Sequence, residues 1–170
     1  LDIRINKLGK DHTSVATSYN NIAIVYESQN KYDEALEYYN KSLDIDINKL
    51  GKDHTNVAAS YLGIANVYKS QNKYDEALEY YNKSLDIDIN KLGKDHTDVA
   101  GSYNNIGEVY RKQNKYDEAL EYYNKSLDIR INKLGKDHTS VATSYNNIAI
   151  VYESQNKYDE ALEYYNKSLD

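Results

Sequence analysis

Histidines recur in this 170-residue sequence at a fixed step of 42 residues, at His12, His54, His96 and His138. Imidazole groups bind zinc, but a zinc site needs three or four ligands that surround one ion. In a chain built from repeats, equivalent residues are displaced along the array and do not converge. We therefore expect no metal site, and we place each histidine in a loop or in the first turn of a helix.

Paired carboxylates such as Asp33 and Glu34 recur at the same step and could act in acid–base catalysis. However, the helix dipole favours acidic residues in the first turn of a helix, which explains these pairs without a reaction. The sequence has no cysteine, no glycine-rich phosphate loop, no nucleophile elbow and no zinc-protease motif. We therefore expect a protein that is not an enzyme and that uses no cofactor.

The 42-residue step organises the whole chain. The pentapeptide Leu-Gly-Lys-Asp-His begins at Leu8, Leu50, Leu92 and Leu134. It divides the sequence into a tail of a preceding repeat, three full repeats and a partial fourth repeat, which are residues 1–12, 13–54, 55–96, 97–138 and 139–170. Because a fixed period of 20–50 residues is typical of solenoids, we expect a single solenoid over residues 1–170.

Each repeat carries two helical patterns. In the first repeat the apolar residues Val15, Tyr19, Ile22 and Tyr26 follow at spacings of four, three and four, which predicts a helix over residues 14–29. Asp11 and Thr13 are expected to cap its start. Asn30 is expected to end it, because asparagine tolerates the left-handed backbone conformation.

A second helix is predicted from about Asp33 to Leu50, since no proline interrupts this stretch and Gly51 suits a helix end. The turn between the two helices is so short that they must form an antiparallel hairpin. Of the two neighbouring tyrosines in the second helix, Tyr39 is expected to be buried and Tyr38 to be exposed.

The repeat resembles the tetratricopeptide repeat (TPR), in the longer 42-residue form of the kinesin light chains. The residues that match its two helices are Tyr19, Ile22, Ala23, Tyr26, Tyr32, Ala35, Tyr39 and Leu43. Three positions depart from the family pattern, because Thr13 and Ile47 stand where proline is usual and Ser42 stands where alanine is usual. The resemblance implies an all-α solenoid, a right-handed superhelix of antiparallel helix hairpins, that binds an extended peptide or a partner protein in its concave groove.

Nine of the 42 positions differ among the three full repeats, and six of them fall on one side of the first helix, opposite its apolar face. By the resemblance, this side lines the concave groove, and we call these positions the variable stripe. The candidate protein-binding residues on it are Thr17, Asn20, Asn21, Ile24, Glu27, Leu62, Asn66, Lys69, Asn104, Asn105, Glu108, Arg111, Lys112, Asn146, Asn147, Ile150 and Glu153.

Asparagine amides on the variable stripe can both donate to and accept from the backbone of an extended peptide. Lys69, Arg111 and Lys112 form a basic centre between Glu27 and Glu153, which suits a peptide with an acidic group. The alternative interpretation is that these positions face solvent and drift because nothing constrains them. A recently duplicated or engineered array with no selected ligand would show the same pattern.

The two ends of the chain suggest a second role. Residues 1–44 are identical to residues 127–170, and the sequence begins and ends within a second helix. The stub of one molecule could complete the cut helix of the next, so we expect end-to-end stacking into a structural rod. The residues expected to make this contact are Leu1, Ile3, Ile5, Leu8, Tyr165 and Leu169.

Composition limits the other partners. The net charge of −6 opposes a sequence-independent grip on nucleic acid, which needs clustered positive charge. We expect no membrane partner, because no apolar run approaches the length of a membrane helix. The absence of cysteine and of a signal peptide favours the cytoplasm, and the absence of methionine suggests a segment excised or processed from a larger protein.

Overall fold

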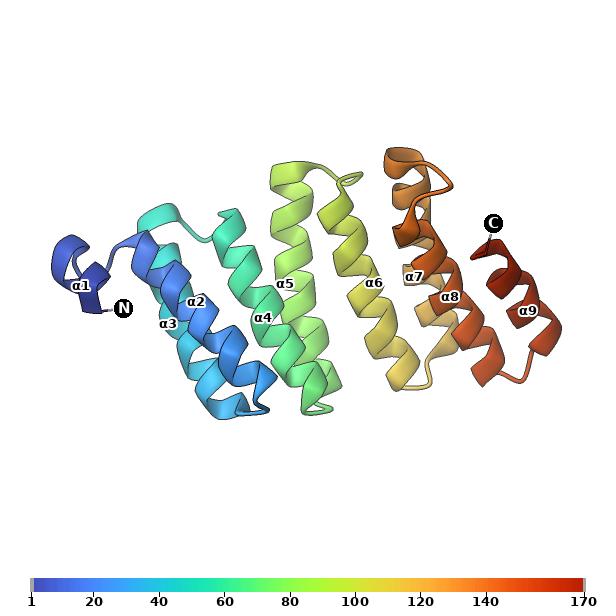
Figure 1. The fold of residues 1–170 in the computed structure, drawn as a ribbon, viewed down its shortest axis with the longest axis horizontal. Coiled ribbons are helices and arrows are strands. Elements are labelled where there is room, and N and C mark those ends of the chain that lie inside the picture. The colour runs from blue at the N-terminus through green and yellow to red at the C-terminus, as the bar shows by residue number, and fades with distance from the viewer. Residues whose placement is uncertain (1, 170) are drawn as a thin grey trace. The chain divides into compact units, whose positions relative to one another are not determined.

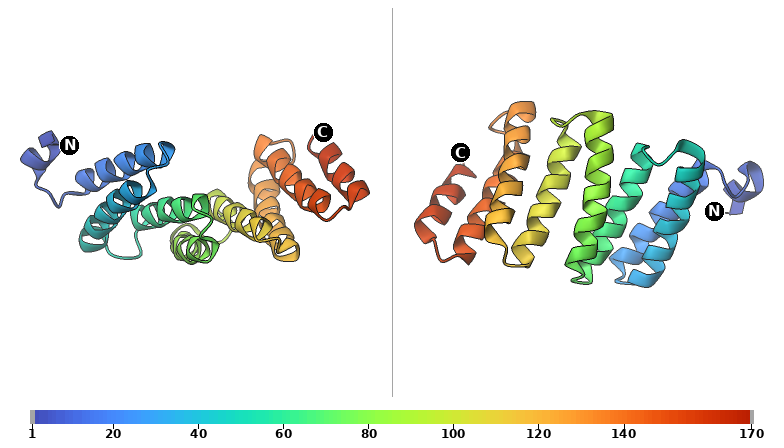
Figure 2. Two further views of the ribbon diagram at one scale, coloured as in Figure 1. Left: turned by 90° about the horizontal axis from the view of Figure 1, so that it is seen from below. Right: turned by 180° about the vertical axis from the view of Figure 1, so that it is seen from behind.

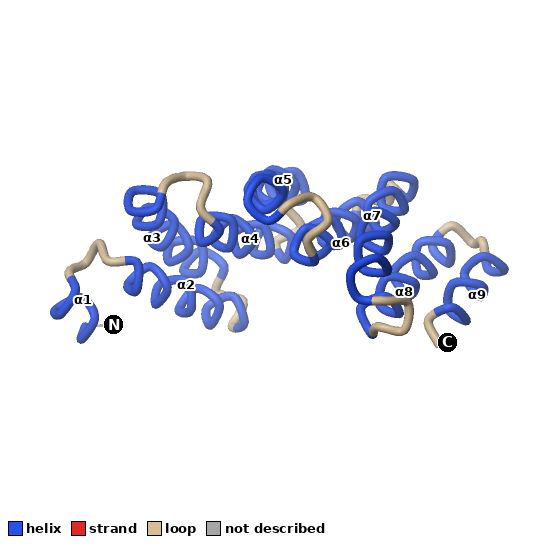
Figure 3. The backbone as a smooth tube through the Cα atoms, turned by 90° about the horizontal axis from the view of Figure 1, so that it is seen from above, coloured by secondary structure: helices blue, strands red, loops and turns tan. Residues whose placement is uncertain are grey.

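A computed structural model describes residues 2–169, and all structural statements below concern these residues. Between Asp2 and Leu169 the chain forms nine helices and no strand (Figure 1), which confirms the all-α fold class. The helices are α1 (Asp2–Leu8), α2 (Thr13–Ser28), α3 (Tyr32–Leu50), α4 (Thr55–Ser70), α5 (Tyr74–Leu92), α6 (Thr97–Lys112), α7 (Tyr116–Leu134), α8 (Thr139–Ser154) and α9 (Tyr158–Lys167). Short loops connect them (Figure 3).

The start of each first helix differs from the prediction. The N-cap of α2 is His12, whose Nδ1 atom accepts a hydrogen bond of 3.1 Å from the backbone N–H of Ser14. His12 has an extended backbone (φ −84°, ψ 141°), which places its ring over the first turn. Asp11 and Thr13, which we expected to cap this helix, flank the residue that does so. The histidines His54, His96 and His138 cap α4, α6 and α8 in the same way.

The ends of both helices agree with the sequence. Asn30 has a φ of 58°, and the chain turns there directly into α3. The second helix runs for 19 residues to Leu50 and ends at Gly51, whose φ of 88° is unfavourable for any residue with a Cβ atom. Ile47 lets this helix continue, because it has the backbone N–H that the proline usual at this position in the family would lack.

The chain divides into two compact units, one up to Lys91 and one from Leu92 onwards. In the first unit α2 and α3 form a hairpin, α3 packs on α4, and α2 lies beside α4. In the second unit α6 pairs with α7, α7 packs on α8, and α8 pairs with α9. Figure 2 shows these hairpins from two further sides. That both units belong to a single solenoid stays a prediction.

Each unit has its own apolar core between successive hairpins. In the first unit Tyr39 from α3 packs with Ile64 and Val67 from α4, and all three are 2% exposed or less. In the second unit Tyr123 from α7 is buried in one cluster with Ile148 and Val151 from α8. In α3 and α7 this tyrosine therefore joins one repeat to the next, and the burial of Tyr39 confirms the prediction from its spacing.

Serine at the position where the family has alanine forms a bond between the two helices of one repeat. The Ser84 Oγ atom donates to the carbonyl oxygen of Ala58 at 2.9 Å, and Ser126 Oγ donates to Ala100 at 2.7 Å. These side chains are almost fully buried. The hydroxyl group is thus satisfied, as a buried polar group must be.

Tyr38 is half-buried, so the expectation of an exposed ring is wrong. Its ring stands between the rings of Tyr19 and Tyr26, with centroid distances of 5.7 and 5.5 Å. The ammonium group of Lys41 lies 4.6 Å from the centroid of the Tyr38 ring. The same group of three rings and one lysine recurs in the other three repeats, so the second helix anchors both of its neighbouring tyrosines.

Candidate protein-binding surface

The variable stripe lies on α2, α4, α6 and α8, and none of the 17 candidate residues on it is fully buried. The most accessible are Thr17, Asn21, Ile24, Lys112 and Glu153, and the others are half-buried. Within the first unit the stripe spans the neighbouring helices α2 and α4, and within the second unit it spans α6 and α8. Each unit therefore offers a two-helix face that a partner could reach.

Asparagines join adjacent repeats in the second unit. The Nδ2 atom of Asn147 on α8 donates to Oδ1 of Asn104 on α6 at 2.8 Å. The corresponding positions in the first unit are Asn20 and Gly63, and Gly63 has no side chain to donate. As a result the Oδ1 atom of Asn20 is buried without a hydrogen-bond partner. The residue at the variable position of Asn147 and Gly63 thus decides whether neighbouring first helices share a side-chain hydrogen bond.

The variable stripe also provides a hydrogen-bond partner for one tyrosine hydroxyl in each repeat. The hydroxyl of Tyr39 donates to Glu27 Oε2 at 2.9 Å, and Tyr165 makes the same bond to Glu153. In the second repeat a lysine replaces this glutamate, and the tyrosine hydroxyl instead reaches Oδ1 of Asn66, at 2.5 Å. The residues at these variable positions therefore differ between repeats, but in each repeat one of them bonds to the hydroxyl of the same tyrosine.

In the third repeat the partner of this tyrosine is a cation. The side chain of Arg111 donates to the hydroxyl of Tyr123. Burial raises the pKa of Tyr123, and Arg111 partly offsets this shift. Burial likewise raises the pKa of Tyr39, and the bond to Glu27 raises it further. The predicted basic centre includes Lys69 of the first unit and Arg111 and Lys112 of the second, so it stays a prediction.

A second set of paired variable positions, which was not predicted from the sequence, lies at the junctions between repeats. The guanidinium of Arg130 donates to the carbonyl oxygen of Ser140 at 3.0 Å and to Ser144 Oγ at 2.8 Å. At an earlier junction, Asp46 takes the place of this arginine and bonds to the Asn56 side chain. This pairing can be seen in the sequence, because an arginine at the position of Arg130 always accompanies a serine at the position of Ser140.

Asp46 is 3% exposed, and burial raises its pKa. The bond to Asn56 and the field of His54 act in the opposite direction. Its Oδ1 atom is buried with no hydrogen-bond partner. The buried carboxylate therefore lowers the stability of the fold at this junction.

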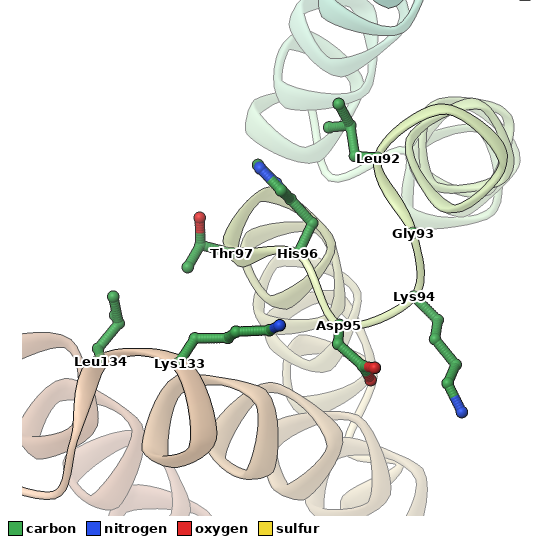
Figure 4. A pocket seen from close by; sticks show the side chains of 8 residues that line it. All are labelled: Leu92, Gly93, Lys94, Asp95, His96, Thr97, Lys133 and Leu134. Carbon is green, nitrogen blue, oxygen red and sulfur yellow. The ribbon is translucent and has the colours of Figure 1, made fainter.

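Two hollows of the same composition lie at the loops between repeats, away from the variable stripe. One has a volume of about 510 Å³, and Figure 4 shows its lining residues, Leu92, Gly93, Lys94, Asp95, His96, Thr97, Lys133 and Leu134. The other has a volume of about 550 Å³ and is lined by the equivalent residues from Leu8 to Thr13 with Lys49 and Leu50. No group of three or more potential metal ligands occurs among residues 2–169.

The residues expected to stack the ends differ in accessibility. Leu1 lies outside the described residues. Ile3 and Leu169 are 73% and 84% exposed, Leu8 is exposed, and Ile5 and Tyr165 are half-buried. End-to-end stacking through these residues stays a prediction.

Within the described part of the chain, no helix is both long enough and apolar enough to cross a membrane.

Comparison with known proteins identifies the repeat. The family model of the tetratricopeptide repeat matches residues 1–48, 14–90 and 91–170. No curated protein matches the sequence.

Solved structures match the chain significantly in 172 cases. Those described here cover 98% of it. BtubC (BKLC) from P. vanneervenii has a TM-score of 0.86 and 24% identity, with 98% of this chain and 66% of BtubC covered. Nearly identical TPR-like repeats of a Podosopora anserina protein described as a kinesin light chain have a TM-score of 0.79 and 23% identity, with 98% and 79% covered.

The apo form of RapI has a TM-score of 0.83 and 21% identity, with 98% of this chain and 58% of RapI covered. The chain thus spans just under two thirds of BtubC and a smaller share of RapI. At these identities the similarities show the fold, an all-helical solenoid of helix hairpins.

Proposed function

The chain belongs to the tetratricopeptide repeat family, and from this premise we propose that it is a non-enzymatic scaffold whose variable stripe holds an extended peptide or a partner protein. Repeats of this family generally bind peptides or proteins, and members with this fold are typically not enzymes. The specific partner depends on the side chains that this chain presents.

The observation that carries the proposal is the set of asparagines on α6 and α8. Asn104, Asn105, Asn146 and Asn147 lie on one two-helix face, and all four are half-buried. The bond between Asn147 and Asn104 holds the two helices in register at this face. Asn105 and Asn146 flank that bond, where their amides can bond to the backbone of an extended peptide.

Charge suggests the kind of peptide. Lys112 is exposed at the end of α6, on the variable stripe. Arg111, next to it, is engaged by Tyr123 and keeps a positive charge near the same face. A peptide with a carboxylate near this end of the second unit would gain a charge-assisted bond.

A displayed library of random peptides tests the proposal. We expect enriched peptides to carry an acidic residue, and we expect the double variant N105A/N146A to bind them at least tenfold more weakly. The matched control is N124A, because Asn124 is an exposed asparagine on α7, outside the variable stripe. Failure to enrich any peptide, or equal binding by both variants, would favour an array with no selected ligand.

A further inference from the structure

Tyr123 of α7 combines a buried ring with a hydroxyl that reaches the variable stripe. The residue is 2% exposed and lies in one cluster with Ile148 and Val151 of α8. A Cβ atom on Gly107 of α6 would stand 2.9 Å from Cδ1 of the tyrosine, so the ring rests against the backbone of that helix. Contacts with two neighbouring helices therefore fix the ring, and with it the place of its hydroxyl.

The hydroxyl of Tyr123 meets Arg111 of the variable stripe. Arg111 lies one turn after Gly107 on the same side of α6, and its guanidinium donates to the hydroxyl. The carboxylate of Glu108 also lies near this hydroxyl. Because a guanidinium has several N–H donors in a planar fork, Arg111 retains donors for a carboxylate of a ligand.

The same relationship recurs in other repeats with residues of different charge. In the first repeat Tyr39 donates at 2.9 Å to Glu27, which occupies the position of Arg111. In the second repeat the tyrosine hydroxyl reaches Asn66. A tyrosine hydroxyl can both donate and accept, so one constant residue is able to hold an acid, an amide or a cation on the stripe.

From these observations, and resting on the scaffold function proposed above, we propose that Tyr123 positions Arg111, and that Arg111 selects an acidic side chain in the bound peptide. An arginine that is free in solution loses rotamer freedom when it binds a ligand, and the bond to a fixed hydroxyl removes part of this loss beforehand. The planar guanidinium then suits a carboxylate better than an amide or a cation.

The repeats themselves supply a variant that should reverse the selection. R111E introduces the glutamate that the first and fourth repeats have at this position, where the tyrosine hydroxyl donates to it. The unaltered chain should bind an acidic peptide from the displayed library about tenfold more tightly than the same peptide with lysine in place of the acid. R111E should show the opposite preference, because it places a carboxylate where the guanidinium was.

Y123F tests the positioning, because it retains the ring and removes only the hydroxyl. It should bind the acidic peptide about tenfold more weakly, and its affinity for the peptide with an amide in place of the acid should stay within about twofold. The matched control is Y122F, because the Tyr122 ring packs against the rings of Tyr103 and Tyr110 on the apolar side of α6. Urea unfolding checks that both variants are folded.

A measurement without any peptide separates this inference from the scaffold function. The chain has only three arginines, Arg4, Arg111 and Arg130, so their Nε–H signals can be resolved by NMR. The heteronuclear NOE of Arg111 Nε–H should be high in the unaltered chain and should fall in Y123F. That of Arg130, which two hydrogen bonds hold on α8, should stay the same in both proteins.

Each result decides a different part of the proposal. An equally ordered Arg111 in the unaltered chain and Y123F, or equal binding of the acidic peptide by both, would overturn the positioning by Tyr123. An unchanged preference in R111E would overturn the selection by Arg111. A library that yields no peptide would overturn the scaffold function and this selection with it, while the NMR comparison would still decide whether Tyr123 holds Arg111.

Discussion

The ring of Tyr39 lies directly against the backbone of Gly63, the residue that faces it from the next repeat. A Cβ atom on this glycine would stand 2.3 Å from Cε1 of the tyrosine, closer than side chains tolerate. Gly63 is one of the variable positions, and asparagine occupies it in the other repeats. The glycine in the middle of α4 therefore leaves room for the close approach of this ring.

This contact predicts opposite effects for two substitutions of helical glycines. G63A should destabilise the protein by about 1–3 kcal/mol, because the added methyl group overpacks the joint. G101A should stabilise it by about 1 kcal/mol, because its Cβ atom would meet open space and alanine favours the helix. Urea titration followed by circular dichroism measures both, and a stable G63A would contradict the close packing.

The histidine caps predict a substitution pattern of their own. His54 accepts from the backbone N–H of Asn56 at 3.1 Å, so H54A should cost about 1 kcal/mol by removing the acceptor. H54N should retain most of the stability at neutral pH, because asparagine is a strong N-cap residue. Thermal unfolding of the three proteins checks the order, and equal losses for both variants would argue against a capping role.

Asp46 predicts a pH-dependent gain in stability. A carboxyl group whose pKa is raised by folding destabilises the fold above that pKa, and this effect disappears as the pH falls through the raised pKa towards its unfolded value. D46N should therefore stabilise the protein by about 1 kcal/mol near pH 7, and its advantage should shrink at acidic pH. The exposed Asp44 on the same helix provides the control D44N, which should change little.

The hydrogen bond between Asn147 and Asn104 predicts unequal effects on stability for substitutions of two equivalent asparagines. N147A should destabilise the second unit by about 1 kcal/mol, because it leaves Asn104 Oδ1 without its donor. N21A alters the equivalent residue of α2, which is exposed, and should cost less. Amide hydrogen exchange in α6 and α8 should rise only in N147A, and unchanged protection there would contradict the link.

Local chemistry was readable from the sequence. The helix ends at Asn30 and Gly51 are correct, because both residues adopt a positive φ more easily than others do. The apolar spacing placed Tyr39 in the core, and the residues at matching positions carried the resemblance to the family. The N-cap was misassigned because histidine is an uncommon cap, and its role depends on a ring orientation that the sequence does not reveal.

The tertiary structure decided which residues of the variable stripe have partners within the protein. From the sequence, Glu27 and Asn66 were equally available to a ligand, but each accepts a bond from a buried tyrosine. Tyr38 was wrongly predicted to be exposed for a related reason, because its burial depends on two rings of the other helix in the hairpin.

The sequence by itself determined the period, the helices and the side of the first helix on which variation falls, because these follow from spacing and from local backbone preferences. Only the tertiary structure decided that Gly63 makes room for Tyr39, that Asn147 bonds to Asn104, and that Val25 is exposed while the identical residue Val151 is buried. Each of these depends on the neighbouring repeat. Identical sequences in a repeat protein therefore differ in role through what packs against them.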